Sequence, residues 1–307
     1  MLERAKYFSK EKNNSRPFPL LLVLVLVIFF STFPRFLFAQ YTDIINSNIP
    51  GNSMGAYTVG EAVYQLETFY SNDHQKHIYL NTDNQIKTIE STFRFGFKER
   101  IELIYEFGHR TKIDNNTNAS YKGLSKNRLG FKVLLYDPHQ FAEPDYYSWK
   151  NNHRFVIKNL IPVVSLYAGL NVHKKESFFN RHNPFDPTSE VYPTIYDREL
   201  LILQQHLSPY WVLVTNIAID KPTSEREYSL TSTLIHGFKH YYKLSLFAEF
   251  QTILNDYYSD EIFRAGGAYL INTNIQVDAF LGSNIKNTPS RLFFGLGASI
   301  RVDNHFK

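Results

Sequence analysis

The sequence closes with RLFFGLGASIRVDNHFK (residues 291–307), and this stretch decides the fold. From Phe294 to Phe306 every even position is apolar except Asn304, whereas the odd positions carry Gly, Ser, Arg, Asp and His. A period of two describes a β-strand with one apolar and one polar face. The stretch therefore predicts a long strand at this end of the sequence.

The same alternation recurs along most of the chain. Clear examples are KTIESTFRFGF (residues 87–97) and NRLGFKVLLY (residues 127–136). We count about twelve strands of roughly 9–12 residues and find no amphipathic helix. Long polar connections, predicted at residues 71–86 and 110–126, alternate with short turns, as in a barrel whose two ends face different compartments. Residues 137–161 break this order, either as an excursion or by hiding an additional strand.

The N-terminal residues have a different character. Residues 1–19 are basic, and LLLVLVLVIFF (residues 20–30) is an apolar core, which together predict a cleaved signal peptide over residues 1–39. The mature domain is then residues 40–307. Residues 1–39 hold six of the 33 Lys and Arg and two of the 29 Asp and Glu, so the remainder carries 27 of each. This balance gives no support to a nucleic-acid partner.

The composition also limits the chemistry. There is no Cys, so a thiolate metal site or a cysteine nucleophile is excluded. The pair His74 and His77 in HQKH has a spacing that suits a metal, but no third ligand is nearby. No metalloprotease, serine-hydrolase or phosphate-binding motif is present. We therefore predict no catalytic residue, no metal site and no cofactor.

Two all-β architectures can alternate in this way. A soluble sandwich buries its apolar faces, whereas a membrane barrel turns them to lipid and its polar faces to the lumen. Full charges on the polar faces and aromatic residues near strand ends favour a single antiparallel transmembrane β-barrel. The predicted lumen-lining residues are Glu61, Glu67, Glu90, Arg94, Glu102, Glu106, Arg128, Lys132, Glu249, Arg264, Asp278 and Arg301.

Several segments carry a family resemblance. Residues 40–70, 92–105, 208–219 and 274–301 fit the pattern of a family of bacterial outer-membrane β-barrels, described as transporters or as outer-membrane proteins of the meta-pathway of phenol degradation. The pattern includes an Asp and a Gly in the penultimate strand, here Asp278 and Gly282. The resemblance implies a location in the outer membrane of a Gram-negative-type bacterium.

The favoured function is a passive channel for an unknown small-molecule solute. Six of the charges, on the first three strands, are expected to form an acidic patch around Arg94. Such a patch either biases the lumen toward cations or forms charge pairs that hold the wall together. In a further hypothesis, Arg128, Lys132, Arg264 and Arg301 supply the opposite wall and a transverse field. The alternatives are a barrel without a pore that presents loops to partners and, less favoured, an envelope lipid hydrolase.

The last strand is expected to close the barrel on the first, near residues 59–70. Its even face then contacts outer-membrane lipid. Barrels of this class commonly end in an aromatic residue, so Phe306 is the expected signal for the barrel-assembly machinery, although Lys307 follows it.

Overall fold

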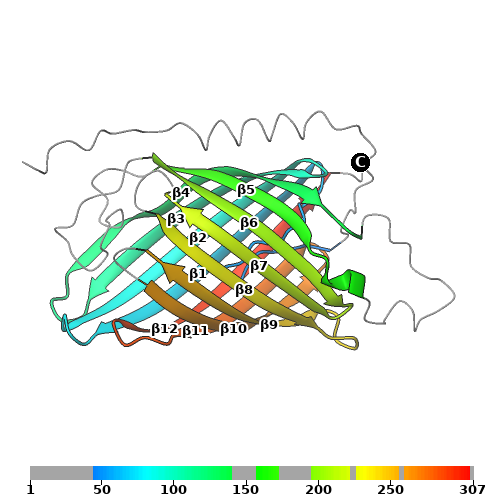
Figure 1. The fold of residues 1–307 in the computed structure, drawn as a ribbon. Coiled ribbons are helices and arrows are strands. Elements are labelled where there is room, and N and C mark those ends of the chain that lie inside the picture. Colours follow the sequence, from blue (N-terminus) through cyan, green and yellow to red (C-terminus); the bar gives the residue numbers. More distant parts are fainter. Residues whose placement is uncertain (1–43, 140–156, 173–194, 222–225, 256–258, 305–307) are drawn as a thin grey trace, which may run out of the picture. The chain divides into compact units, whose positions relative to one another are not determined.

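The computed structural model describes residues 44–139, 157–172, 195–221, 226–255 and 259–304. Within these ranges twelve strands and one short 3-10 helix, η1 (Ile157–Leu160), follow one another along the chain (Figure 1). The strands are β1 (Val63–His77), β2 (Thr82–Lys98), β3 (Ile101–Asp114), β4 (Ser120–Tyr136), β5 (Val163–Val172), β6 (Ile195–Ser208), β7 (Trp211–Asp220), β8 (Glu227–Gly237), β9 (Leu244–Leu254), β10 (Ser259–Asn272), β11 (Ile275–Asn284) and β12 (Ser290–Asp303).

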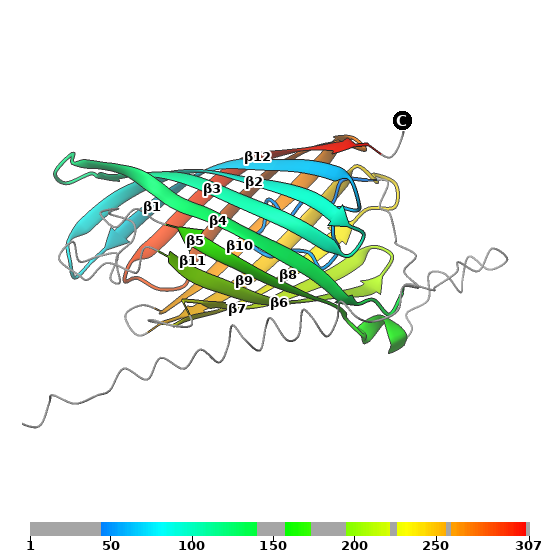
Figure 2. The same ribbon diagram turned by 90° about the horizontal axis from the view of Figure 1, so that it is seen from above.

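The twelve strands form one closed antiparallel barrel. Each strand pairs with its neighbours in the sequence, and β12 closes the ring on β1, as Figure 2 shows. The closing register sets Leu66 opposite Ile300 and Tyr70 opposite Leu296. Closure gives every strand two neighbours, so the ring has no edge strand. The predicted fold class, strand number and closing pair are confirmed.

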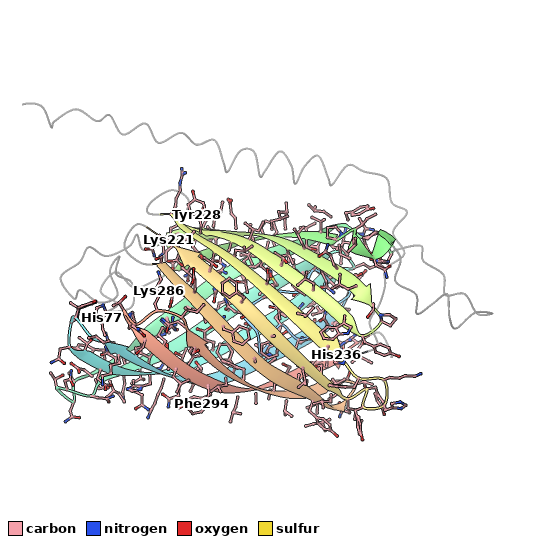
Figure 3. All side chains as sticks on the ribbon, turned by 60° about the horizontal axis from the view of Figure 1, so that its bottom comes forward. His77, Lys221, Tyr228, His236, Lys286 and Phe294 are labelled. Carbon is pink, nitrogen blue, oxygen red and sulfur yellow. The ribbon has the colours of Figure 1, made fainter. Side chains whose placement is uncertain are left out.

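The two faces of β12 point as the alternation predicts. Leu296 and Ile300 are exposed on the outside, whereas Ser299 and Arg301 are buried inside. Phe294 projects from the outer face in Figure 3. The barrel therefore has an apolar exterior and a polar interior, the reverse of a soluble sandwich. No helix in the described ranges has the length and apolar character of a membrane span.

Two predicted long connections are wrong. Residues 71–86 and 110–126 are mostly strand, because β1 pairs with β2 up to His77 and Thr82, and β3 pairs with β4. Only residues 78–81 and 115–119 form turns. These strand ends are polar on both faces, so the backbone pairs while the alternation that marks a strand is lost. His74 accordingly lies in β1, where its Nε2 is 2.8 Å from Asp83 Oδ1.

The described residues of the ambiguous segment 137–161 contain no strand. β4 pairs directly with β5, and η1 is the element described between them. Residues 140–156 lie outside the described ranges. The predicted signal peptide, residues 1–39, and the predicted assembly signal, Phe306, also lie outside them.

Candidate functional site

A segment that precedes the first strand lies inside the barrel. We call residues 44–62 the inserted segment. It contains no helix and no strand, and its last two residues form a turn. Ile45 N donates a hydrogen bond of 2.8 Å to Thr273 O, at the turn between β10 and β11, and Ala62 N donates one of 2.9 Å to Gly96 O. Between these points Ala56 and Val59 are buried. In Figure 2 the blue trace of this segment lies within the ring of strands.

The end of the inserted segment explains one wrong site prediction. Gly60 and Ala62 have positive φ angles of 95° and 55°, which break the alternation before β1 begins. A Cβ on Gly96 would lie 1.5 Å from Gly60 O, so only glycine lets the two backbones approach here. Glu61 sits in this turn and is exposed, so it does not line the lumen.

An irregular segment in an interior needs partners for its backbone, because unpaired buried N–H and C=O groups are costly. Carboxylates on the wall accept several of the N–H groups. Asn48 N donates to Glu67 (3.1 Å), Val59 N to Glu102 (3.1 Å), and Asn52 N and Ser53 N both donate to Glu249 Oε2 (2.8 and 3.2 Å).

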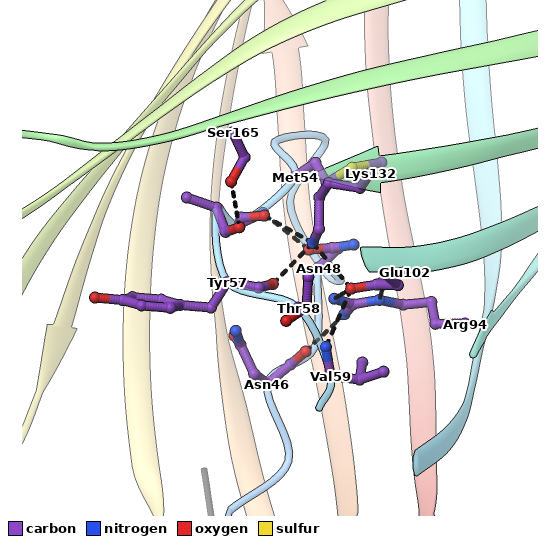
Figure 4. A network of polar contacts seen from close by, with 12 residues as sticks. Asn46, Asn48, Met54, Tyr57, Thr58, Val59, Arg94, Glu102, Lys132 and Ser165 are labelled. Carbon is purple, nitrogen blue, oxygen red and sulfur yellow. Dashed lines mark hydrogen bonds and ion pairs between the residues drawn. The ribbon is translucent and has the colours of Figure 1, made fainter. Parts of the chain in front are cut away.

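Donors on the wall satisfy the carbonyl oxygens in the same way. Lys132 Nζ donates to Gly55 O (3.1 Å) and Tyr57 O (2.8 Å), and Arg94 Nη1 donates to Asn46 O (2.7 Å) (Figure 4). Ser165 Oγ donates to Ala56 O at 2.6 Å. The wall thus replaces the strand partners that this segment lacks.

Four charged residues bind one another as well as the segment. We call Glu67, Arg94, Glu102 and Lys132 the charged cluster. Arg94 lies 2.8 Å from Glu67 and 2.5 Å from Glu102, and Lys132 Nζ lies 3.2 Å from Glu102. All four side chains are at most 1% exposed, so none of them presents its charge to water.

A second group of charges lies on β2, β3 and β4, nearer to the turns at residues 78–81 and 115–119. Lys126 Nζ is 2.6 Å from Glu90 and 3.3 Å from Glu106, and Arg128 is 3.1 Å from Glu106. Tyr167 also donates a hydrogen bond to Glu106 at 3.0 Å. Glu90 and Glu106 therefore belong to this group and not to a patch around Arg94.

The hypothesis of an opposite basic wall is wrong for Arg128 and Lys132. Both lie on β4, next to the strand that carries Glu102 and Glu106, and cross-strand pairing sets Lys132 opposite Glu102. In an antiparallel meander, consecutive strands are neighbours, so charges on them pair directly and do not oppose each other across the lumen.

The remaining predicted residues lie on β9 to β12. Arg264 Nη1 is 2.7 Å from Glu249, and Arg301 is 3.3 Å from Asp303. Asp278 is buried, and it shares with Ile49 of the inserted segment the space that a side chain at Gly297 would need.

On the β5–β8 side the inserted segment meets neutral groups. Ala56 N donates to Gln204 Oε1 at 3.0 Å, and Asn216 both accepts from Met54 N (3.1 Å) and donates to Met54 O (3.0 Å). Thr233 Oγ1 lies 2.7 Å from Ser53 Oγ and donates to Glu249 Oε2 at 2.7 Å. An apolar cluster completes this contact: Ala56 packs among Ile104, Leu134, Val163, Tyr167, Leu200, Ile202 and Ala218.

Two cavities lie inside the barrel on either side of one turn of the inserted segment. The inner cavity, about 270 Å³, lies between residues 45–55 and β6–β11, and its wall includes Gln204, Thr233 and Gln276. The outer cavity, about 290 Å³, is lined by β1–β4 and β10–β12. Pro50 and Gly51 line both cavities. We call this turn, which borders both cavities, the partition turn.

Sequence reasoning missed the inserted segment. The available signal was INSNIPGNSMGAYT (residues 45–58), which is rich in Asn, Ser and Gly, contains no alternation and lies shortly before the first strand. Its wall partners Gln204, Asn216 and Thr233 were missed too, because a neutral amide or hydroxyl on an inward face looks like ordinary lumen lining. In the described ranges no cluster of three His, Cys, Asp or Glu could hold a metal ion.

Solved structures of other proteins have a similar architecture. An outer membrane channel from Pseudomonas putida F1 has 11% identity, and the match covers 84% of this chain and 100% of that chain with a TM-score of 0.53. The translocator domain of the autotransporter NalP from Neisseria meningitidis has 10% identity over 79% of this chain and 89% of its own, with a TM-score of 0.41. At such identities the first likeness supports the fold alone. The search of curated proteins gives no match.

A family model matches residues 47–302. The matched range begins inside the inserted segment and ends one residue before the end of β12, so it includes most of the segment as well as the barrel. The chain belongs to the family described as "Putative MetA-pathway of phenol degradation", which confirms the resemblance drawn from the sequence.

Proposed function

We propose that this protein is a passive channel for small molecules in the bacterial outer membrane, and that the inserted segment gates it. The carrying observation is the pair of cavities inside the barrel that share Pro50 and Gly51 as lining residues. In this proposal a solute that crosses the barrel passes the turn that these two residues form. The similar fold of a protein named an outer membrane channel supports the proposal.

The apolar exterior of the barrel supports the outer-membrane location. Leu66, Phe93, Leu129, Phe250 and Leu296 are exposed on five strands of the barrel. Such a belt is stable against hydrocarbon but costly in water. We extend the proposal to export through a signal peptide at residues 1–39, to contact with membrane lipid, and to insertion by the barrel-assembly machinery through Phe306.

The interior charges have mainly a structural role in this proposal. The members of the charged cluster bind one another and the backbone of the inserted segment. In this proposal they hold the gating segment in position. Removing one member of a buried pair leaves an uncompensated charge. Selectivity belongs to the charges that line the outer cavity.

Conductance measurements test the proposal. Purified wild-type protein in planar bilayers is expected to give small conductance steps. The double variant Gln204→Ala, Asn216→Ala removes neutral contacts to the inserted segment and is expected to give larger or longer openings. The lipid-facing variant Ile217→Ala is the matched control on the same strand. Protein that folds but gives no conductance and no solute flux, with the double variant equally silent, would contradict a channel.

One observation favours a second function. The inserted segment fills part of the interior and is bonded to most of the wall, as expected of a barrel without a pore. In that case its role is to rigidify the barrel, and loosening the segment lowers stability without raising conductance. The conductance measurement on the double variant distinguishes a gated channel from a barrel without a pore.

A further inference from the structure

The outer cavity combines aromatic and basic walls above the partition. Residues 50–52 of the inserted segment form its floor, and β1, β2, β3, β4, β10, β11 and β12 contribute its sides. Its volume of about 290 Å³ is near the lower limit of ligand pockets, which are about 300–1,000 Å³. The cavity therefore suits a small molecule.

One side of the cavity is aromatic. Phe69, Phe280 and Phe293 line it, and the rings of Phe280 and Phe293 are 6.2 Å apart in an edge-to-face arrangement. Two glycines make room for these rings. A Cβ on Gly295 would lie 2.3 Å from the Phe280 ring, and one on Gly282 would lie 2.5 Å from the Phe293 ring. The rings consequently lie against the wall and leave the cavity open.

The other lining groups are mainly cations. Arg110, Lys126, Arg264 and Arg291 line the cavity with the carboxylates Asp73 and Glu90. Each cation reaches farther into solvent than the carboxylates it pairs with. The side chain of Arg110 is 37% exposed against 12% for Glu90, and that of Arg291 is 20% exposed against 0% for Asp260. A solute in the cavity therefore meets guanidinium and ammonium N–H donors before it meets carboxylate oxygens.

From this geometry we infer that the outer cavity binds small organic anions that carry an apolar ring, such as a ring carboxylate. The carboxylate accepts hydrogen bonds from the basic groups, and the ring packs on Phe69 and Phe280. Arginine favours this chemistry, because its planar fork binds a carboxylate through two parallel hydrogen bonds. The inference names the solute class of the channel and in that respect rests on the proposed function, but binding itself does not require transport.

Neutral and cationic analogues fit less well. An amine would place its positive charge among N–H donors, while the carboxylates that could receive it are engaged by Arg and Lys. An alcohol of the same shape keeps the ring contact and loses the charge-assisted hydrogen bonds, which are roughly twice as strong as neutral ones.

Binding is measured on the full-length protein in detergent by 19F NMR. The ligands are 4-fluorobenzoate, 4-fluorobenzyl alcohol and 4-fluorobenzylamine. Saturable binding is expected for 4-fluorobenzoate only. Arg110→Gln is expected to raise its dissociation constant about tenfold, since a hydrogen bond to a charged group contributes enough for that factor. Lys122→Gln makes the same charge change on an exposed residue of β4 that lines neither cavity, and it is expected to leave the constant unchanged.

Two outcomes would overturn the inference. One is equal binding of benzoate and amine, and the other is a benzoate affinity that Arg110→Gln and Lys122→Gln affect alike. Neither depends on conductance, so a channel that conducts but fails to bind the anion refutes only the site. A protein that binds the anion but never conducts refutes only the channel.

Discussion

The inserted segment is held by two walls of different chemistry. On the β1–β4 side its partners are the charged cluster, whose members also bind each other. On the β5–β8 side its partners are the neutral side chains of Ser165, Gln204, Asn216 and Thr233, of which Thr233 also bonds to Glu249 at 2.7 Å. Both walls satisfy the same kind of backbone group. The two walls differ in what the loss of one side chain does. Removing a charged side chain leaves other buried charges without a partner, whereas removing a neutral side chain removes only its own hydrogen bonds.

The largest expected effect is on the charged side. Arg94→Met leaves Glu67 and Glu102 buried without their common partner, so the free energy of unfolding is expected to fall by about 3–5 kcal/mol. Urea unfolding in detergent, read from the heat-modifiable mobility of the barrel on gels, measures it. The double variant Glu67→Gln, Arg94→Met keeps the pair of Glu102 and Lys132 and is expected to recover part of the loss. If the double variant is less stable than Arg94→Met, the coupling is wrong.

The second prediction concerns Glu249, whose carboxylate holds the backbone next to the partition turn. It accepts hydrogen bonds from Asn52 and Ser53 and pairs with Arg264 at 2.7 Å. Glu249→Gln is expected to cost about 1.5–3 kcal/mol, the range for hydrogen bonds to charged groups, and to raise single-channel conductance. Unchanged conductance in a destabilised variant would show that the turn is not the gate.

The neutral side should give the smallest effect. Ser165→Ala removes one donor to Ala56 O and is expected to cost about 0.5–1.5 kcal/mol, with conductance close to that of the wild type. The same unfolding measurement checks it. A loss as large as that of Arg94→Met would erase the difference between the two walls.

The barrel could be predicted from the sequence, because lipid outside and polar groups inside impose a period of two on every strand. The limits of this signal were also physical. The ends of β1 to β4 are polar on both faces, so their pairing is invisible to alternation. The inserted segment has no period at all, because its order comes from side chains remote in sequence: Ser47, for example, bonds to Ser299 at 2.8 Å. Predicting the partners of Arg94 would have required the register of three strands, which the composition does not provide.

The most direct test of gating locks the inserted segment to the wall. Ser53 Oγ and Thr233 Oγ1 are 2.7 Å apart, and the chain has no Cys, so the variant Ser53→Cys, Thr233→Cys offers a single disulfide. Single-channel conductance is recorded before and after a reductant is added, with Ser53→Cys alone as the control. The gating account predicts a closed oxidised state and recovery of conductance on reduction. Equal conductance in the two states of a variant shown to be fully cross-linked would contradict it.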